Sequence, residues 1–347
     1  MSEHKFPYKW YLADGYPAKG IEKHGLKVFG TFICGGGSTM GYKLAGYEHL
    51  GGVEIDPPIA DVYKTNHHPK YLFTEDIREF NKRTDLPEEL YNLDLLDGSP
   101  PCSTFSMSGE REKAWGKEKK FREGQSMQTL DDLVFIYCNT IIKLQPKVFL
   151  LENVKGIIQG NAKAYSKAIV DKMTKAGYVV QVFCLNAASM GVPQARERVF
   201  FIGHKKEFSF QRLKLNFDEK NILFGEFQVK KSKPKEGGIY FNLLKNRLSS
   251  DTCIADIYDR IHGKRSGMNT KICHPSRVVD TLVSGSHYYD YDYISPLKNE
   301  EFLLIQTFPI DYNFKNVSVK YMCGMSVPPV MTAQIAHQIY LQWLSKL

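Results

Sequence analysis

The residue best placed to do chemistry is Cys102, which closes the run Leu-Asp-Gly-Ser-Pro-Pro-Cys. The hydrophobic residues 93–96 predict a strand, and Gly98 with the two prolines predicts that it ends in a sharp turn. The backbone of such a turn is rigid, so it exposes the cysteine thiol in a fixed direction, which suits a nucleophile. On this fragment alone a buried, unreactive cysteine is the commoner outcome, so the rest of the chain has to decide.

A carboxylate and two guanidinium groups also stand beside predicted strands. Glu152 directly follows a buried strand at 147–151, and a carboxylate at the C-terminal end of a parallel strand lies in the crevice where such sheets bind ligands. Arg196 and Arg198 precede a strand at 199–203. Because they are two positions apart, strand alternation would point both to one side, where they could clamp a phosphate or a carbonyl oxygen.

The elements that must position these groups alternate between strand and helix. A strand, the glycine-rich turn 34–41 and a helix open the chain in the manner of nucleotide-binding folds. Glu54 ends the second strand about 20 residues later, where a carboxylate can accept ribose hydroxyls. Asp76, after the third strand, is either an acceptor for an adenine amino group or a helix N-cap. The predicted strands are 27–33, 50–55, 71–73, 93–96, 147–151, 178–185 and 199–203, and the main predicted helices are 130–144, 164–176, 297–308 and 330–344.

The composition is that of a globular protein. The 347 residues are 43% hydrophobic and 24% charged, which allows one large or two ordinary domains with a real core. The apolar runs are too short to span a membrane, and the polar start lacks a signal-peptide pattern, so we expect a cytoplasmic protein without membrane contact. The seven cysteines form no C-x-x-C pair, so neither a metal site nor a disulfide framework is expected.

The positive charge is concentrated in one segment. Residues 205–271 hold fifteen Lys or Arg and eight Asp or Glu, so this segment carries +7 of the net +8. Such a segment on a near-neutral body indicates a polyanionic partner, although a solvated lysine-rich surface is the alternative. The long polar stretch 106–128 is also basic, and we interpret it as a lid over an anionic substrate or as a solvated charge run.

Six motifs, in order, resemble those of the DNA (cytosine-5)-methyltransferase family of bacteria and phages. They are F-x-x-G-G-G-S-T-M-G from Phe32, P-P-C at 100–102, E-N-V at 152–154, Q-x-R-x-R at 194–198, R-V-V-D-T-L at 277–282 and G-M-S-V-P-P at 324–329. The resemblance covers roughly residues 28–203 and 274–345. The chain departs from the family pattern at Cys34, at Ser103 (usually Gln) and at Met325 (usually Asn).

The resemblance implies an α/β fold, with a Rossmann-like doubly wound S-adenosylmethionine-dependent methyltransferase domain and a smaller, basic target-recognition domain. The catalytic domain would comprise residues 1–205 and 318–347, and the recognition domain with its hinge residues 206–317. S-adenosyl-L-methionine would be the cofactor and S-adenosyl-L-homocysteine the product, with no metal. The residues implied to hold the cofactor are Phe32, Gly36, Gly37, Glu54, Ile55, Asp76, Ile77, Pro101 and Ser326.

For the reaction, the resemblance implies that the thiolate of Cys102 adds to C6 of a cytosine flipped out of a specific double-stranded DNA sequence. The C5 carbon then takes the methyl group. Glu152 would bond N3 and the exocyclic amine, and Arg198 with Arg196 would hold O2. Cys102, Glu152 and Arg198 are all present, so an active enzyme is expected.

The expected partners are double-stranded DNA and, as a candidate, a cognate restriction endonuclease, with the enzyme itself a monomer. The residues expected to contact nucleic acid are Ser106, Arg111, Lys113, Arg247, Arg260, Lys264 and Arg265, with Asn269 and Thr270 as further candidates. Two alternatives stay open: a tRNA cytosine-5 methyltransferase on the same fold, and a catalytically silent DNA-binding relative.

Overall fold

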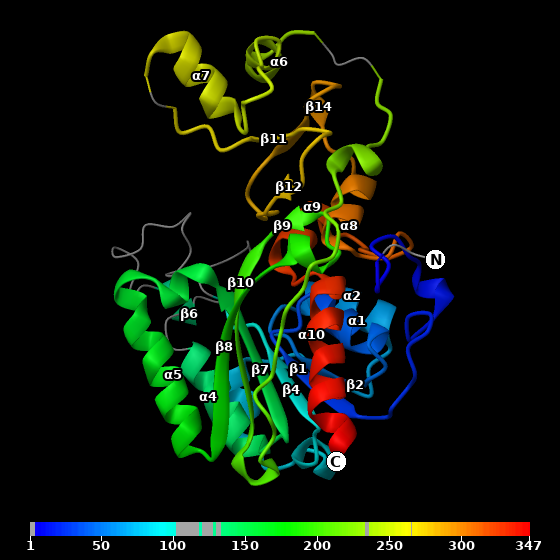
Figure 1. The fold of residues 1–347 in the computed structure, drawn as a ribbon, viewed down its shortest axis with the longest axis vertical. Coiled ribbons are helices and arrows are strands. Elements are labelled where there is room, and N and C mark those ends of the chain that lie inside the picture. Colours follow the sequence, from blue (N-terminus) through cyan, green and yellow to red (C-terminus); the bar gives the residue numbers. More distant parts are fainter. Residues whose placement is uncertain (1–3, 102–117, 120–127, 130–132, 233–235, 265) are drawn as a thin grey trace. The chain divides into compact units, whose positions relative to one another are not determined.

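A computed structural model describes residues 4–101, 118–119, 128–129, 133–232, 236–264 and 266–347 (Figure 1). The chain forms two compact units. The sheet unit comprises Tyr16–Asn186, Glu197–Asn216 and Thr332–Leu347, and the second unit comprises Met1–Gly15, Ala187–Arg196 and Phe217–Met331. These units divide the chain at points other than the predicted domain boundaries. Residues 206–216 belong to the sheet unit, and the second unit includes residues 1–15, 187–196 and 318–331.

The sheet unit is built on one seven-stranded sheet in the order β3-β2-β1-β4-β7-β10-β8. All neighbouring strands are parallel except β10, which is antiparallel to both β7 and β8. The strands are β1 (Lys27–Thr31), β2 (Glu48–Val53), β3 (Tyr71–Phe73), β4 (Leu95–Gly98), β7 (Val148–Val154), β8 (Tyr178–Asn186) and β10 (Glu197–Lys205). Each predicted strand is present within a few residues, and the predicted doubly wound α/β fold is confirmed.

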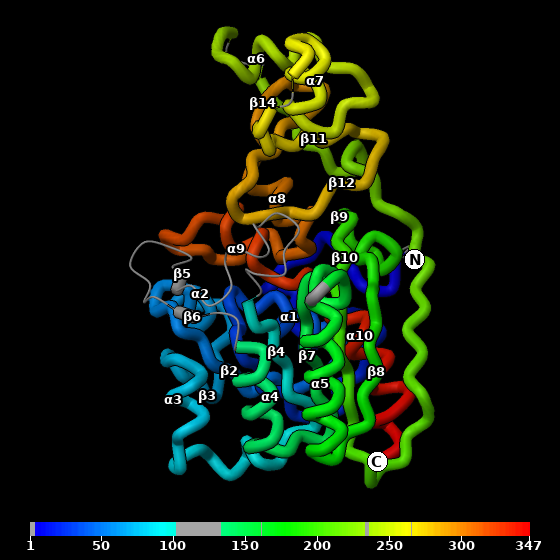
Figure 2. Tube along the Cα trace, turned by 90° about the vertical axis from the view of Figure 1, so that its left-hand side faces the viewer, coloured from blue at the N-terminus to red at the C-terminus, as the bar shows by residue number. Residues whose placement is uncertain are grey.

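Helices cover both faces of this sheet. One face carries α3, α4 and α5, and the other carries α1, α2 and α10 (Figures 1 and 2). Their bounds are α1 (Gly37–Leu44), α2 (Pro57–His67), α3 (Ile77–Lys82), α4 (Leu133–Leu144), α5 (Lys163–Lys175) and α10 (Pro329–Gln342). Pro57 and Pro58 open α2 as predicted, because the first turn of a helix needs no N–H at those positions. In the predicted lid, the described residues form only a two-stranded pair, β5 (Glu118–Lys119) with β6 (Gln128–Thr129).

The hydrophobic core of the sheet unit fixes the positions of the strand ends. Buried aromatic side chains such as Phe29, Phe149 and Phe201 pack between sheet and helices, and each fully buried side chain of this kind contributes about 1.5–3 kcal/mol. The Tyr137 hydroxyl, from α4, lies 2.9 Å from the Leu96 carbonyl oxygen and 2.8 Å from the Leu150 carbonyl oxygen. This side chain therefore ties β4 to β7 two residues before the end of β4 and four residues before the end of β7.

The second unit has a small core of its own, in which α6 (Ile239–Leu244) and α7 (Ile254–His262) pack through Leu243, Leu244, Ile254, Ile257 and Ile272. Its strands are β9 (Gln194–Ala195), which pairs with β12 (Val279–Asp280), and β11 (Lys271–Cys273), β13 (Tyr288–Asp290) and β14 (Ser295–Pro296), which form a sheet. Two further helices are α8 (Asn299–Gln306), within the predicted helix 297–308, and α9 (Val319–Met325).

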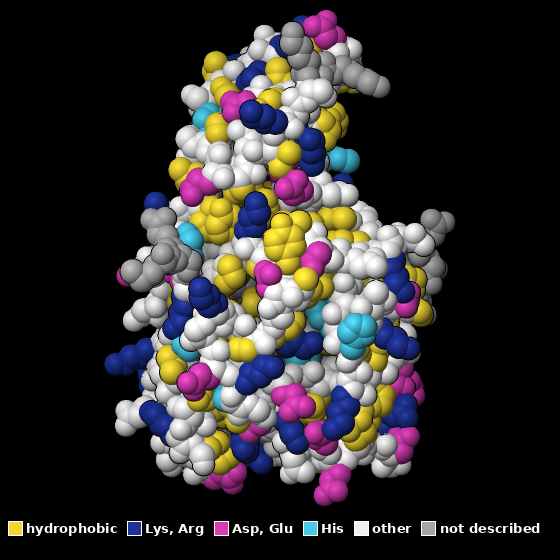
Figure 3. Space-filling model, turned by 90° about the vertical axis from the view of Figure 1, so that its right-hand side faces the viewer, with side chains coloured by type: hydrophobic (Ala, Val, Ile, Leu, Met, Phe, Trp, Pro, Cys, Tyr) yellow, Lys and Arg dark blue, Asp and Glu magenta, His cyan; other side chains and the backbone are white. Residues whose placement is uncertain are grey.

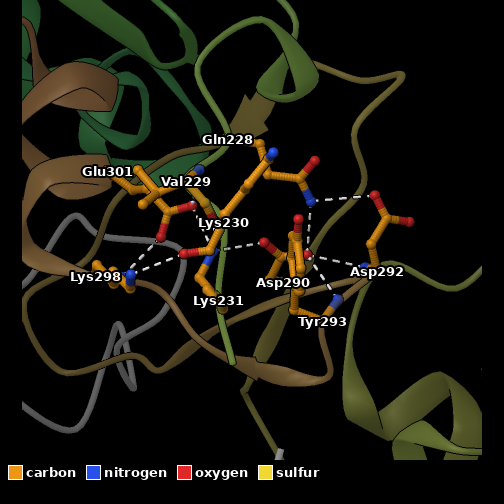
Figure 4. Close-up of polar contacts among 9 residues, drawn as sticks. All are labelled: Gln228, Val229, Lys230, Lys231, Asp290, Asp292, Tyr293, Lys298 and Glu301. Atoms are coloured by element: carbon orange, nitrogen blue, oxygen red, sulfur yellow. Dashed lines mark hydrogen bonds and ion pairs between the residues drawn. The ribbon is translucent and has the colours of Figure 1, made fainter. Parts of the chain in front are cut away.

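A buried ion cluster holds the basic part of the second unit together (Figure 4). The Lys231 ammonium lies 2.6 Å from a carboxylate oxygen of Asp290 and 2.5 Å from one of Glu301, and both carboxylates are completely buried. Gln228 donates to Asp290 at 2.8 Å. Lys231 belongs to the basic segment 205–271 that indicated a polyanionic partner; instead its charge is neutralised inside the unit, where phosphate has no access to it.

The described helices include none that is both long and apolar enough to cross a membrane.

Candidate active site

The glycine-rich turn after β1 requires glycine at one position. Gly36 has φ +74°, and a Cβ there would lie 2.3 Å from Nε2 of His67, so the turn rests directly on the imidazole. Burial lowers the pKa of His67 to about 3, which leaves the ring neutral at this contact. Helix α1 begins immediately afterwards at Gly37, and the first turn of a helix presents N–H groups to an anionic ligand.

Glu54 directly follows β2 and is hydrogen-bonded to the start of the same turn. Its two carboxylate oxygens accept hydrogen bonds from the backbone N–H of Cys34 at 2.9 Å and of Asp56 at 3.0 Å. Burial raises the pKa of Glu54 to about 7 although both bonds oppose the shift. Each carboxylate oxygen has a second lone pair, so the group retains acceptor capacity for the ribose hydroxyls expected there.

The other predicted cofactor-binding residues include Asp76 and Ile77, which follow β3. Asp76 is the N-cap of α3: its carboxylate accepts from the Arg78 N–H at 2.7 Å and pairs with the Arg78 guanidinium at 3.1 Å. The prediction that Asp76 caps a helix is therefore confirmed, and its contact with an adenine amino group stays a prediction. Ile77 is buried beside it. The other cofactor candidates are Phe32, partly buried against the core, Ile55 and Pro101, both of intermediate exposure, and Ser326, buried in the second unit.

These residues fit the cofactor that the motifs imply. Glycine at position 36 lets the turn pack directly against His67, a helix N-terminus suits a carboxylate, and a buried acceptor follows the next strand. An adenosyl group linked to an amino acid has ribose hydroxyls for the buried acceptor and a carboxylate for the helix N-terminus. The geometry therefore supports S-adenosylmethionine on this edge of the sheet.

Glu152 and Arg198 come together at the same edge. They are brought side by side by the antiparallel register of β7 and β10, in which Arg198 is opposite Val154 and Phe200 is opposite Glu152. The Arg198 Nε lies 3.0 Å from the Glu152 Oε1, and only 8% of Glu152 is exposed. Asn153, the next residue, donates to the Pro100 carbonyl oxygen at 3.4 Å, which ties β7 to the Pro-Pro turn.

Arg196 lies between two strands and not on the strand of Arg198, so the premise of strand alternation is wrong, while a contact of Arg196 with the base stays a prediction. The chain ends β9 at Ala195 and starts β10 at Glu197, and the break removes the alternation on which the prediction depended. Arg196 is buried in the second unit, where its guanidinium donates to the Leu282 carbonyl oxygen at 3.2 Å.

Asp97 is a buried acid at this edge that the motifs did not single out. It is the penultimate residue of β4, only 4% exposed, and its Oδ1 accepts from the Tyr42 hydroxyl at 3.2 Å. Burial and, to a smaller extent, the charge of Glu152 raise the pKa of Asp97 to about 7. The sequence signal was available: an acid interrupts a strand that is otherwise hydrophobic.

Five predicted site residues lie outside the described part of the chain. They are Cys102, Ser106, Arg111, Lys113 and Arg265. The described residues of the Pro-Pro-Cys turn end at Pro101.

Two of the predicted nucleic-acid contacts are engaged inside the second unit. Arg260 forms a two-pronged ion pair with Asp251, at 2.6 and 2.9 Å. The Arg247 guanidinium stacks over the ring of Tyr291, 4.6 Å from its centroid, and donates to the Leu244 carbonyl oxygen at 3.0 Å. Both arginines thus have structural roles. On the face of the molecule in Figure 3, lysine and arginine side chains are interspersed with acidic ones, so charge alone marks no binding patch there.

The remaining described candidates line a cleft in the second unit. Its volume is about 540 Å³, and none of its lining residues is acidic. Asn269 is oriented within it, because its Nδ2 donates to the Ser286 hydroxyl at 3.3 Å. The lining residues are Tyr240, Tyr258, Lys264, Ser266, Gly267, Met268, Asn269, Thr270, Gly285, Ser286 and His287.

Comparison with known proteins gives one consistent result. Residues 26–341 match a family model described as C-5 cytosine-specific DNA methylase. The type II methyltransferase M.FnuDI of Fusobacterium nucleatum is 30% identical over 70% of this chain, and the match covers 64% of its own length. The type II methyltransferase M1.HphI of Haemophilus parahaemolyticus is 26% identical over 90% of this chain and 86% of its own.

A solved structure shows the same fold. A variant of DNMT2 from Spodoptera frugiperda superposes with a TM-score of 0.58 at 17% identity, covering 91% of this chain and 99% of that one.

Proposed function

Since the chain belongs to the C-5 cytosine-specific DNA methylase family, whose members are S-adenosylmethionine-dependent methyltransferases, we propose that it methylates C5 of cytosine in double-stranded DNA through a covalent intermediate. The family that the six motifs indicated is thereby confirmed. The observation that supports the chemistry best is the Glu152–Arg198 pair at the end of β7, tied through Asn153 to the turn that leads to Cys102.

The proposed reaction starts at the thiol. The sulfur, which has lost its proton to water, adds as the thiolate to C6 of the ring, and the electrons of the C5–C6 double bond move so that C5 becomes nucleophilic. Glu152, in its protonated form, donates a hydrogen bond to N3 and accepts one from the exocyclic amine, which stabilises the negative charge that the ring gains during this addition. Arg198 contacts the carboxyl group of Glu152 at 3.0 Å, which holds that group in position, and the Arg198 guanidinium would bond O2.

Bound S-adenosylmethionine supplies the electrophilic methyl group. The residues that would hold it are those of the glycine-rich turn, with Glu54 at the ribose and Ile77 beside the adenine. After C5 is methylated, the C5 proton leaves to a base, the C5–C6 double bond forms again, and the Cys102 sulfur departs from C6. Because C5 and C6 are covered by neighbouring bases in a stacked duplex, the cytosine has to leave the stack before the thiol can reach it.

The cleft in the second unit is the proposed place of base contact. It combines two tyrosine rings, an oriented amide at Asn269 and the ammonium of Lys264. A lining that contains a basic residue and no acidic one suits nucleic acid. We expect Lys264→Ala to weaken DNA binding for all sequences. The slope of the logarithm of the DNA-binding constant against the logarithm of salt concentration should become smaller by about one. Lys271→Ala is the matched control, because Lys271 is already paired with Asp280 at 3.3 Å. Equal salt slopes for the two variants would contradict the assignment.

Transfer of tritium from labelled S-adenosylmethionine tests the activity. The purified chain is incubated with unmethylated genomic DNA and, separately, with tRNA. Label in DNA is expected for the parent chain and for Cys184→Ala, whose thiol is exposed on β8, and no label for Cys102→Ala. Sequencing of converted DNA then gives the target. Label in tRNA alone would favour the RNA alternative, and no label in either would favour a silent relative.

A further inference from the structure

Methyl transfer as proposed gives no task to Asp97, although this carboxyl group is buried at the ligand-binding edge. Its Oδ1 accepts from the hydroxyl of Tyr42 at 3.2 Å, and Ser38 also hydrogen-bonds to it. Ser38 and Tyr42 are four residues apart on α1, so both face the same side of that helix. Asp97 therefore anchors the helix that follows the glycine-rich turn to the strand that precedes the Pro-Pro turn.

The backbone at Asp97 is held equally firmly. The Thr31 hydroxyl, at the end of β1, lies 3.2 Å from the Asp97 carbonyl oxygen. At the next residue, Gly98, a Cβ would lie 2.4 Å from the Tyr137 ring and 2.7 Å from the Thr31 hydroxyl oxygen. Packing this dense leaves the end of β4 no room to move independently of β1 and α4, so a displacement of one is transmitted to the others.

The contacts continue from β4 to the group that would bind the cytosine. Asn153 donates to the Pro100 carbonyl oxygen at 3.4 Å, and Glu152 beside it pairs with Arg198 at 3.0 Å. Every member of this series belongs to the sheet unit. It runs without interruption from α1, through Asp97 and the Pro-Pro turn, to Glu152.

We propose that Asp97 is a positioning residue that couples occupation of the cofactor turn to the position of Glu152. Cofactor binding orders the glycine-rich turn and α1. The two hydroxyl contacts transmit this order to β4, and the Asn153 contact passes it on to β7. This inference rests on the proposed function for its two ligands, the cofactor and the base, but the residues to which it gives a new role, Asp97 and Tyr42, touch neither in the proposed reaction.

Hydrogen–deuterium exchange tests the coupling without DNA and without methyl transfer. S-adenosylhomocysteine is added, and exchange is followed in a peptide covering 148–158. In the parent chain, the ligand is expected to slow this exchange by about threefold or more. In Tyr42→Phe, which removes one of the two hydroxyls and keeps the ring, the ligand should bind within about threefold of the parent affinity while the protection of 148–158 is reduced. Asp97→Ala, which removes the acceptor of both hydroxyls, should lose this protection entirely, and the double variant should lose no more.

Asp94→Asn is the matched control. Asp94 is also buried, but it lies at the other end of β4, where it accepts from Lys27 N at 2.7 Å and pairs with Lys147 at 2.7 Å. Its variant should show full protection on ligand binding. Protection of 148–158 in Tyr42→Phe equal to that in the parent would overturn the coupling. Loss of S-adenosylhomocysteine binding in Tyr42→Phe would overturn it as well, because Asp97 and Tyr42 would then be part of the cofactor site. A chain that shows the coupling yet labels no DNA would refute only the proposed activity.

Discussion

Replacement of Glu152 by glutamine separates the catalytic task of this carboxylate from its structural one. The Glu152 and Arg198 side chains are 10% and 14% exposed, so their contact is largely shielded from water. Deleting one partner of a buried pair costs about 3–5 kcal/mol, because the other charge is left uncompensated. Glutamine keeps the shape and one acceptor oxygen, so we expect Glu152→Gln to lose about 1.5–3 kcal/mol, the range for a hydrogen bond to a charged group.

The loss in catalysis should be larger than this loss in stability. A preorganised group that stabilises charge in the transition state contributes about 10²–10³ in rate, which corresponds to about 2.7–4 kcal/mol. We therefore expect single-turnover methyl transfer by Glu152→Gln, with saturating labelled cofactor, to be slower by about that factor, while cofactor affinity stays within about threefold. Urea unfolding of the same preparation measures the stability.

The neighbouring Glu197 supplies the control. It also carries a carboxylate paired with a cation, Lys155 at 2.9 Å, but both side chains are 40% or more exposed. Exposed pairs of this kind contribute little, so Glu197→Gln should change the unfolding free energy by no more than about 0.5 kcal/mol and leave the rate unchanged. If Glu152→Gln and Glu197→Gln transfer methyl groups at the same rate, Glu152 has no role in charge stabilisation and the reasoning is refuted.

Three further outcomes are expected. Gly36→Ala should weaken S-adenosylhomocysteine binding, measured by calorimetry, more than tenfold, because a Cβ collides with the imidazole beneath it; Gly177→Ala, equally left-handed at φ +92° but with open space, should not. Lys231→Met should lower the unfolding free energy by about 3–5 kcal/mol, because it leaves two buried carboxylates unpaired, whereas Lys230→Met at the exposed neighbour should stay within about 0.5 kcal/mol in the same urea titration. Burial raises the pKa of Glu54 from 4.5 to about 7, so the folded state holds a proton that the unfolded state has lost, and stability should fall as pH rises from about 4.5 to 7; Glu54→Gln should flatten this part of the pH curve, and a parallel curve would contradict the assignment.

The sequence by itself determined the elements and their order. Periodicity and turn chemistry are local properties, so each strand of the sheet, the glycine-rich turn and the proline start of α2 could be placed within a few residues. The position of Glu54 at a strand end followed from the same reading. The family followed from six short motifs, because each keeps its residue types at fixed spacing whatever lies between them.

Only the tertiary structure decided which charged groups meet. Glu152 and Arg198 pair because β10 inserts antiparallel beside β7 in one particular register, and no local signal specifies that register. The same limitation explains the errors. Strand alternation was applied to Arg196, although β10 begins one residue after it, and Lys231 was counted in a segment expected to bind a polyanion, although two carboxylates about 60 and 70 residues away neutralise it. Charge in a sequence gives the number of ionic groups, but their availability to a ligand depends on long-range packing, which brings distant residues to within hydrogen-bonding distance.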